Sequence, residues 1–156
     1  MMSPLCERVI HALLERGQTL ATAESLTGGG IGAALTAIPG SSSVYKGGVI
    51  SYTNWVKETM LGVSGETLET HGAVSVQTAE EMAVGVRRLL QADVAVSVTG
   101  LAGPGGDDYG NPVGTVCIGY SDAQESFAVK FHFPGDREAV RTQTIRAALE
   151  LVLDSQ

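Results

Sequence analysis

The sequence has few positive charges. Ten Lys and Arg residues stand against seventeen Asp and Glu residues, which gives a formal net charge of −7 at pH 7 and a pI of about 4.8. Proteins that bind nucleic acids hold the phosphate backbone with clustered Lys and Arg, whereas here the basic residues are scattered apart from Arg87-Arg88 and a group near the C-terminus. We therefore expect no nucleic-acid partner, although one or two arginines are enough to bind an anionic small molecule.

The sequence is also poor in cysteine and in long hydrophobic runs. Its two cysteines, Cys6 and Cys117, form no Cys-x-x-Cys motif, so neither a disulfide framework nor structural zinc is expected. No apolar run approaches the roughly 20 residues that span a membrane, and the N-terminus lacks a basic segment followed by an apolar one. We expect a cytoplasmic protein without membrane association, folded as one domain over residues 1–156.

The spacing of apolar residues predicts helices and strands that alternate, followed by a late hairpin. We expect helices over 4–16, 31–38, 55–61, 64–70, 77–90 and 136–153, and strands over 20–23, 48–53, 93–98, 114–120 and 126–133. A glycine-rich loop covers 100–112, and Asp136 is the expected N-cap of the last helix. This order predicts a three-layer α/β/α domain with a mixed, mostly parallel sheet of about five strands and an antiparallel edge.

Ser25 is the first candidate for chemistry. It follows a short buried strand and precedes Gly28, Gly29 and Gly30, so its side chain is expected on the ligand side of the sheet, next to backbone N–H groups that can hold a phosphate or an oxyanion. Alternatively, Ser25 or Thr27 merely caps the next helix, and this segment alone favours neither interpretation. The Rossmann, Walker and Gly-x-Ser-x-Gly motifs are all absent.

A nucleophilic serine needs a base, and Lys57 is the best candidate. The histidines His11, His71 and His132 have no Asp partner in a recognisable pattern. Lys57 follows a predicted strand, as Ser25 does, and a lysine becomes a useful base when burial or a nearby cation lowers its pKa. The alternative is an ordinary solvated lysine on a helix.

Further polar residues lie near these two positions in the predicted fold. Tyr52 could orient the lysine or be an ordinary strand aromatic, and Asn54 could bind substrate or cap the following helix. Thr99 and Gly100 end a strand before the glycine-rich loop, as Ser25 ends an earlier strand.

Two arginines lie four residues apart at the start of the last helix. Arg137 and Arg141 could together bind a phosphate, because guanidinium groups match its geometry. The alternative is ordinary surface pairing with Asp136 or Glu138.

Together these segments resemble the CinA C-terminal domain family, over about residues 5–153. The matching motifs are Ala-Glu-Ser-x-Thr-Gly-Gly at 23–29, Tyr-x-Asn-x-x-Lys at 52–57, Gly-x-Ala-Gly-Pro at 100–104, Gly-Thr-Val at 114–116 and Gly-Asp-Arg at 135–137. Leu26 stands where a cysteine is common in that family. The family resemblance also includes longer proteins that carry a nucleotide-processing domain, which this sequence lacks, so we expect a stand-alone deamidase.

The resemblance implies a hydrolase that converts the carboxamide of nicotinamide mononucleotide to the acid and ammonia, in pyridine nucleotide (NAD) salvage. It implies a serine-lysine amidase without metal or cofactor, in which Ser25 is the nucleophile, Lys57 the general base and Tyr52 its assistant. The alternative within the family is a non-catalytic nucleotide-binding module, in which the turn at 28–30 only holds a phosphate. The resemblance also implies a homodimer or higher homo-oligomer.

The resemblance further implies which residues bind the pyridine mononucleotide. Thr99, together with the amides of residues 28–30, would lie near the acyl centre or the phosphate, and either Arg137 or Arg141 would meet the phosphate. Thr27, Asn54 and Gly100 are the other expected substrate-binding residues. Tyr45 or Tyr52 could stack on the pyridinium ring.

Overall fold

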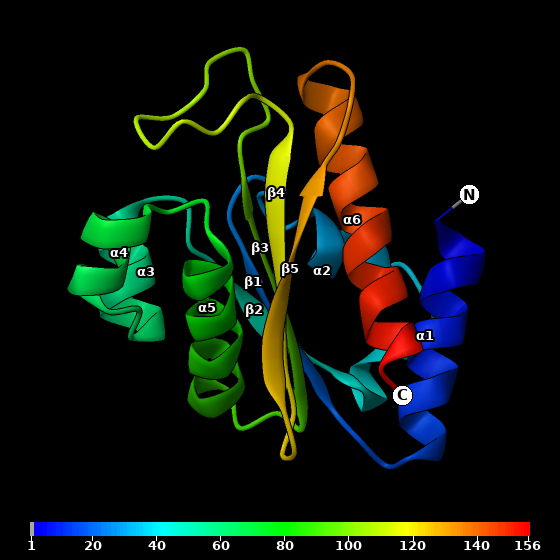
Figure 1. The fold of residues 1–156 in the computed structure, drawn as a ribbon. Helices are drawn as coiled ribbons and strands as arrows, with labels where there is room; N and C mark the ends of the chain where they lie inside the picture. The colour runs from blue at the N-terminus through cyan, green and yellow to red at the C-terminus, as the bar shows by residue number, and fades with distance from the viewer. Residues whose placement is uncertain (1) are drawn as a thin grey trace.

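A five-stranded mixed sheet forms the middle layer of the computed structural model, which describes residues 2–156 (Figure 1). The strands are β1 (Leu20–Glu24), β2 (Tyr45–Ile50), β3 (Val94–Gly100), β4 (Thr115–Ser121) and β5 (Ser126–His132), in the spatial order β2-β1-β3-β4-β5. β1 pairs in parallel with β2 and β3, whereas β4 is antiparallel to both of its neighbours. Only β4 therefore runs against the others, which confirms the mixed, mostly parallel sheet.

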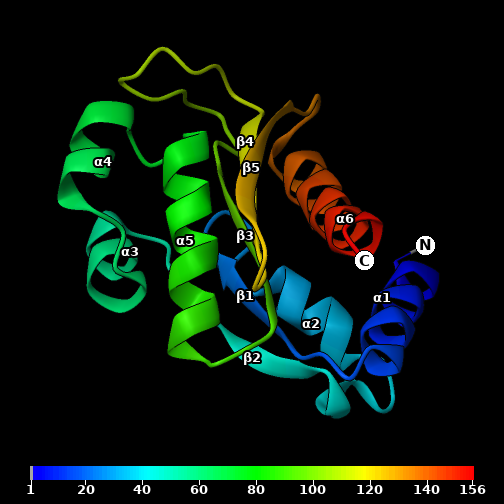
Figure 2. The same ribbon diagram turned by 60° about the horizontal axis from the view of Figure 1, so that its bottom comes forward.

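Helices cover both faces of the sheet, which confirms the three-layer α/β/α prediction (Figures 1 and 2). On one face lie α1 (Ser3–Glu15), α2 (Gly30–Thr36) and α6 (Arg137–Asp154), and on the other lie α3 (Asn54–Leu61), α4 (Gly65–His71) and α5 (Val76–Leu89). A short 3₁₀ helix, Ser41–Ser43, leads into β2. On the second face α5 packs directly on the strands, and α3 and α4 pack on α5.

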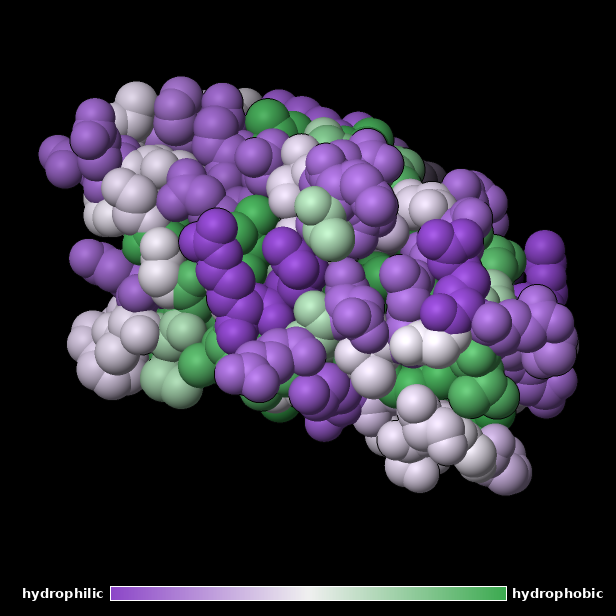
Figure 3. Space-filling view, turned by 90° about the horizontal axis from the view of Figure 1, so that it is seen from below, coloured by the Kyte–Doolittle hydropathy of each residue, from purple (hydrophilic) through white to green (hydrophobic). Residues whose placement is uncertain are grey.

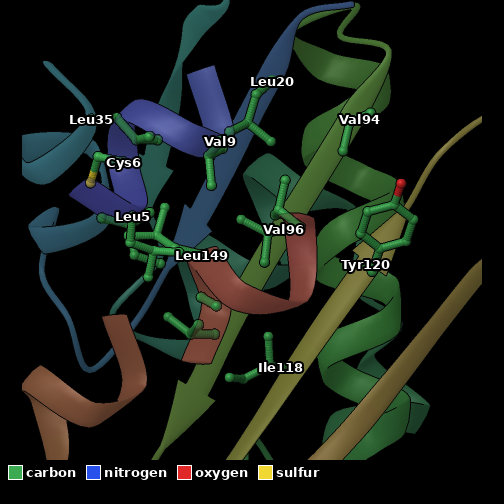
Figure 4. Close-up of a cluster of buried hydrophobic side chains, with 14 of the residues drawn as sticks. Leu5, Cys6, Val9, Leu20, Leu35, Val94, Val96, Ile118, Tyr120 and Leu149 are labelled. Atoms are coloured by element: carbon green, nitrogen blue, oxygen red, sulfur yellow. The ribbon is translucent and has the colours of Figure 1, made fainter. Parts of the chain in front are cut away.

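The core lies on both faces of the central strands. β1 and β4 are buried along their whole length, because helices cover them on both sides. The larger apolar cluster fills the space between the sheet and α1, α2 and α6 and includes Val9, Leu20, Val96, Ile118 and Leu149 (Figure 4). A smaller cluster lies under α5. The sheet is thus a rigid base for the loops at its carboxyl end.

The strand predicted over 48–53 is wrong at both ends, because β2 covers Tyr45–Ile50. Both of its glycines, Gly47 and Gly48, lie within the strand. Gly48 pairs with Thr22 of β1, and a Cβ on Gly48 would collide with the Thr22 side chain. After Ile50 the chain bends towards α3 instead of continuing as a strand.

The helix caps also test the sequence reasoning. Asp136 is the N-cap of α6, as predicted, and its carboxylate accepts a hydrogen bond from the Ala139 N–H at 2.9 Å. The N-cap of α3 is Thr53, so Asn54 is the first helical residue and not the cap.

The end of the molecule opposite the loop after β3 presents a mainly hydrophilic surface with hydrophobic groups between (Figure 3). Across residues 2–156, no helix has both the length and the apolar character that crossing a membrane requires.

Candidate active site

Ser25 lies directly after β1, at the carboxyl end of the parallel strands. Its N–H donates to the Val98 carbonyl of β3 at 3.1 Å, which ties the residue to the centre of the sheet. The chain then turns through Gly28 and Gly29, whose φ angles of 58° and 97° lie in the left-handed region that favours glycine. α2 begins at Gly30, so the sequence motif builds a tight strand-to-helix turn around a buried serine.

The Lys57 amine reaches Ser25 from the other side of the sheet. Lys57 belongs to α3 and is only 1% exposed, and its Nζ lies 3.1 Å from the Oγ of Ser25. Burial lowers the pKa of this lysine to about 8, because desolvation penalises the charged form. Within residues 2–156 no carboxylate forms an ion pair with the amine. Roughly a tenth of the amine is therefore neutral at pH 7 and able to accept a proton.

Two backbone carbonyls orient the Lys57 amine. Nζ donates to the Ser51 carbonyl at 2.7 Å and to the Tyr52 carbonyl at 3.4 Å. A neutral amine has two N–H donors and one lone pair, so when the carbonyls take the donors the lone pair is left for the Ser25 hydroxyl. Ser51 is itself held in place, because its N–H and its hydroxyl both donate to the Glu24 carbonyl. Sequence reasoning missed Ser51. It contacts Lys57 through its backbone carbonyl, which every residue has, so no sequence motif marks the position.

The turn after Ser25 carries backbone N–H groups that are not used within the protein. The amides of Gly28 and Gly30 donate to the carbonyls of Ser25 and Thr27, at 3.2 and 2.9 Å. Throughout the described part of the chain, no acceptor is found for the amides of Leu26, Thr27 and Gly29. Of the three glycine amides singled out in the sequence, only that of Gly29 is thus available to an oxyanion.

Glu24 is a second residue that sequence reasoning missed. It is 2% exposed, and its carboxylate accepts from the Thr27 hydroxyl at 2.6 Å and from the amides of Ile31 and Gly32 at 2.9 and 3.0 Å. The start of α2, which the sequence offered as a phosphate site, is therefore occupied by the protein's own carboxylate. An acidic residue a few positions before a helix start was a readable signal, since anions are stabilised at helix N-termini.

The two arginines of α6 have different surroundings. Arg141 donates to the carbonyls of Leu26 and Thr27, at 2.9 and 3.2 Å, so it holds the turn after Ser25. Arg137 donates to the Gly103 carbonyl at 2.6 Å and to the Tyr52 hydroxyl at 3.3 Å. Arg137 also lines a cavity of about 140 Å³, together with Leu26, Tyr52 and the start of the loop after β3.

The structure does not bring every candidate to the serine. The Thr99 hydroxyl donates to the Ala73 carbonyl at 2.8 Å, and Tyr45 begins β2 at the opposite end from the site, with its hydroxyl 2.6 Å from that of Thr22. Asn54 is exposed at the start of α3, and the Tyr52 side chain is 60% exposed. Gly100 lines the cavity with Arg137.

No histidine takes part in this arrangement. His11 lies 3.1 Å from Glu15 on α1, His71 ends α4, and His132 ends β5. Residues 2–156 contain no group of three or more His, Cys, Asp or Glu side chains arranged to hold a metal ion.

Comparison with known proteins agrees with this architecture. The family model described as the CinA C-terminal domain matches residues 2–155. A putative competence-damage inducible protein from Halothermothrix orenii is 51% identical over 145 residues, and one from Caldanaerobacter subterraneus subsp. tengcongensis is 44% identical over 146 residues. These alignments cover 92% and 94% of this chain but 35% of each relative, so the chain spans about a third of the length of the curated relatives it matches.

Solved structures of the same superfamily superpose closely on the chain. A competence-damaged protein (CinA) superfamily protein from Escherichia coli has a TM-score of 0.98 at 34% identity, covering 100% of this chain and 91% of that one. The competence/damage inducible protein CihA from Agrobacterium tumefaciens has a TM-score of 0.95 at 42% identity, covering 99% and 96%. The chain therefore belongs to the CinA C-terminal domain family.

Proposed function

We propose that this chain hydrolyses the carboxamide of nicotinamide mononucleotide to nicotinic acid mononucleotide and ammonia, with Ser25 as nucleophile and Lys57 as general base. The observation that carries the proposal is the buried Lys57 amine, which lies 3.1 Å from the Ser25 Oγ and has its pKa lowered to about 8. The substrate itself follows from the family resemblance. The geometry supports the chemistry of acyl transfer.

Acylation begins with the neutral amine. Lys57 takes the Ser25 proton while Oγ attacks the carboxamide carbon, and the carbonyl electron pair moves onto oxygen. The unused amides of Leu26, Thr27 and Gly29 are the donors available to hold that oxyanion. When the tetrahedral intermediate collapses, the Lys57 ammonium gives its proton to the departing nitrogen, ammonia leaves, and an ester on Ser25 remains.

Deacylation repeats the same proton transfers with water. Lys57, neutral again, takes a proton from a water molecule that attacks the ester, and the Ser25 oxygen leaves and recovers its proton from the lysine. The amine needs no counter-ion in this cycle, because its charge alternates and the carbonyls of Ser51 and Tyr52 accept its hydrogens in both states.

Substrate recognition is assigned by which groups line the cavity. Both arginines donate to backbone carbonyls, but Arg137 lines the cavity and is the arginine proposed to meet the phosphate, whereas Arg141 holds the turn after Ser25. The exposed Tyr52 ring is the proposed stacking surface for the pyridinium. The occupied start of α2 argues against a module that merely holds a phosphate there, because the Glu24 carboxylate would repel it. We further propose a role in pyridine nucleotide salvage in the cytoplasm, as a homodimer or higher homo-oligomer.

The test is ammonia release from nicotinamide mononucleotide by wild type, Ser25→Ala and Lys57→Ala. Turnover by the wild type and its loss by at least about a hundredfold in both variants are expected, since each removes a partner of the same proton transfer. Lys46→Ala is the matched control, because the Lys46 amine also donates to a backbone carbonyl but is exposed on β2.

The outcomes separate activity from mechanism. A folded wild-type protein without turnover contradicts the amidase proposal. Full activity in Ser25→Ala contradicts the assigned nucleophile and leaves the activity standing. Mass spectrometry of the enzyme during turnover, or trapping with hydroxylamine, detects the Ser25 ester directly.

A further inference from the structure

The Glu24 carboxylate collects hydrogen bonds from the whole turn that carries Ser25. Both its oxygens are used: Oε1 accepts from the Thr27 hydroxyl and the Ile31 amide, and Oε2 accepts from the Gly32 amide, with the Thr22 hydroxyl farther away at 3.4 Å. These donors lie before, within and after the turn. One side chain therefore links the end of β1 to the first turn of α2 across the residues that surround the serine.

The surrounding sequence leaves room for this carboxylate. The Tyr45 hydroxyl, which is 2.6 Å from the Thr22 hydroxyl, would lie only 2.7 Å from a Cβ on Gly32, and the Glu24 Oε2 would lie 3.6 Å from that same Cβ. A Cβ on Gly48 would also lie within 2.8 Å of the Tyr45 hydroxyl. The absence of side chains at Gly32 and Gly48 thus lets Tyr45, Thr22 and Glu24 form a buried polar layer beneath the turn.

Burying a carboxylate is costly unless its oxygens find donors, and here the donors come from the amides of a helix start and from a hydroxyl. Removing the Thr27 hydroxyl would leave Oε1 with the Ile31 amide alone and free the middle of the turn from its inner anchor. On the outer side Arg141 holds the carbonyls of Leu26 and Thr27. The segment between Ser25 and α2 is therefore held by hydrogen bonds on both sides.

We propose that Glu24 is a positioning residue for Ser25, acting through the Thr27 hydroxyl. The carboxylate fixes the turn so that the serine oxygen meets Lys57 and the amides of Leu26 and Thr27 stay free for the oxyanion. This inference rests on the proposed function, because it assumes that Ser25 is the nucleophile. The carboxylate makes no contact with the reacting atoms and acts only on the conformation of the turn.

The experiment compares Thr27→Val with Thr27→Ser. Valine keeps the shape of the buried side chain and removes the hydroxyl, whereas serine restores the hydroxyl and lacks one methyl group. The readout is the rate at which a fluorophosphonate labels Ser25, where the serine oxygen displaces fluoride from phosphorus, so no amide substrate is needed. Values of kcat and KM on nicotinamide mononucleotide and the unfolding temperature complete the measurements.

Thr27→Val is expected to label at least about tenfold more slowly and to lose a similar factor in kcat with KM within about twofold, because a small misplacement of a reacting group is costly. Thr27→Ser is expected to recover most of both rates. Thr144→Val is the matched control, since Thr144 is equally buried and its hydroxyl donates only to the Val140 carbonyl of its own helix. The control is expected to label like the wild type even where it lowers the unfolding temperature.

The results distinguish this inference from the proposed function. Wild-type protein labelled at Ser25 together with equally fast labelling of Thr27→Val overturns the positioning role alone. Equal losses in Thr27→Val and Thr144→Val overturn it as well, because they reduce the effect to general stability. Wild-type protein that releases ammonia but is not labelled at Ser25 overturns the assigned nucleophile, and the positioning role with it, and leaves the proposed activity standing.

Discussion

At the scale of single residues, the environment of one amine decides the chemistry. Lys57 is buried with a serine and two carbonyls as polar neighbours, and burial alone moves its pKa to about 8. A carboxylate in contact would have held the amine charged and removed its use as a base. Two predictions about pH follow from this environment.

The first prediction concerns activity. Because the proposed base is the neutral amine, kcat/KM should rise with pH, reach half of its maximum near the Lys57 pKa of about 8, and level off above it. At pH 7 roughly a tenth of the enzyme would carry the neutral amine. Steady-state rates of ammonia release between pH 6 and 9.5 measure the profile, and a rate that is flat over this range contradicts the assigned base.

The second prediction concerns stability. The folded-state pKa of Lys57 lies below its ordinary value of 10.5, so the unfolded chain binds the proton more tightly. The free energy of unfolding therefore gains from this residue as pH rises from about 8 to 10.5, by up to about 3 kcal/mol, and the penalty is fully present below pH 8. The Lys57→Met variant has no amine at this position, so it lacks this pH-dependent contribution to the free energy of unfolding.

Urea unfolding of wild type and Lys57→Met at pH 7 and pH 10 isolates the effect, because other titrating groups are common to both proteins. The free energy of unfolding of the variant, relative to that of the wild type, is expected to be lower at pH 10 than at pH 7. A difference that does not change with pH would mean that the buried amine has an ordinary pKa.

At the scale of elements, the two arginines of α6 have different surroundings. Arg141 binds the carbonyls of the turn after Ser25, and Arg137, one turn earlier, lines the cavity beside Tyr52 and Gly103. The sequence showed two arginines at the start of a helix and could not separate them, because both lie on the same face. The difference between the two arginines depends on which carbonyls of the turn after β1 lie near each guanidinium group, and only the fold determines that.

The third prediction separates these roles by substrate. Arg137→Gln should raise KM for nicotinamide mononucleotide at least about tenfold with little change in kcat, since a charge-assisted contact to phosphate contributes on the order of 1.5–3 kcal/mol. With the corresponding riboside, which lacks the phosphate, the variant and the wild type should behave alike. Arg141→Gln should impair both substrates. Equal effects of Arg137→Gln on both would contradict the phosphate assignment.

Most elements were predictable because their patterns are local. The helix over 77–90 was found to within one residue as α5, and the buried runs of β3 and β4 were recognised from apolar composition. β2 was misplaced because Gly48 is explained by its close approach to Thr22 of β1, which is remote in sequence. Ser25 and Lys57, which motifs predicted as a pair, lie 3.1 Å apart, whereas Glu24 and Ser51 contribute through hydrogen bonds that involve the backbone and leave no motif.

At the scale of the whole molecule, the site joins elements from both faces of the sheet. Ser25 leads into α2 on one face, and Lys57 is carried by α3, which packs on α5 on the other. The 3.1 Å contact therefore depends on how closely α5 holds α3. Gly85 of α5 sets this approach, because a Cβ there would collide with the Leu61 carbonyl at the end of α3.

The fourth prediction tests that dependence. Alanine usually stabilises a helix interior by up to about 1 kcal/mol relative to glycine. Gly85→Ala should instead lower the free energy of unfolding by about 1–3 kcal/mol, because the collision with a backbone atom forces α3 to shift. The same shift should lower kcat by moving Lys57 away from Ser25.

Gly105→Ala is the control for stability, since nothing lies within 4 Å of its Cβ position and its φ is not in the left-handed region. Urea unfolding and ammonia release measure both effects. A Gly85→Ala protein that is more stable than the wild type and fully active would contradict this prediction. It would show that α3 and α5 accommodate the added methyl group without moving Lys57 away from Ser25.

The carbonyls that orient Lys57 determine how substitutions at position 52 affect the lysine. Because its acceptors belong to the main chain of Ser51 and Tyr52, the aim of the amine does not depend on which side chain occupies the second of these positions. On the proposed mechanism, a substitution of Tyr52 would leave the proposed base oriented, provided that the bend after β2 is kept. Substrate preference could then change at this position while the proposed pair of Ser25 and Lys57 stays the same.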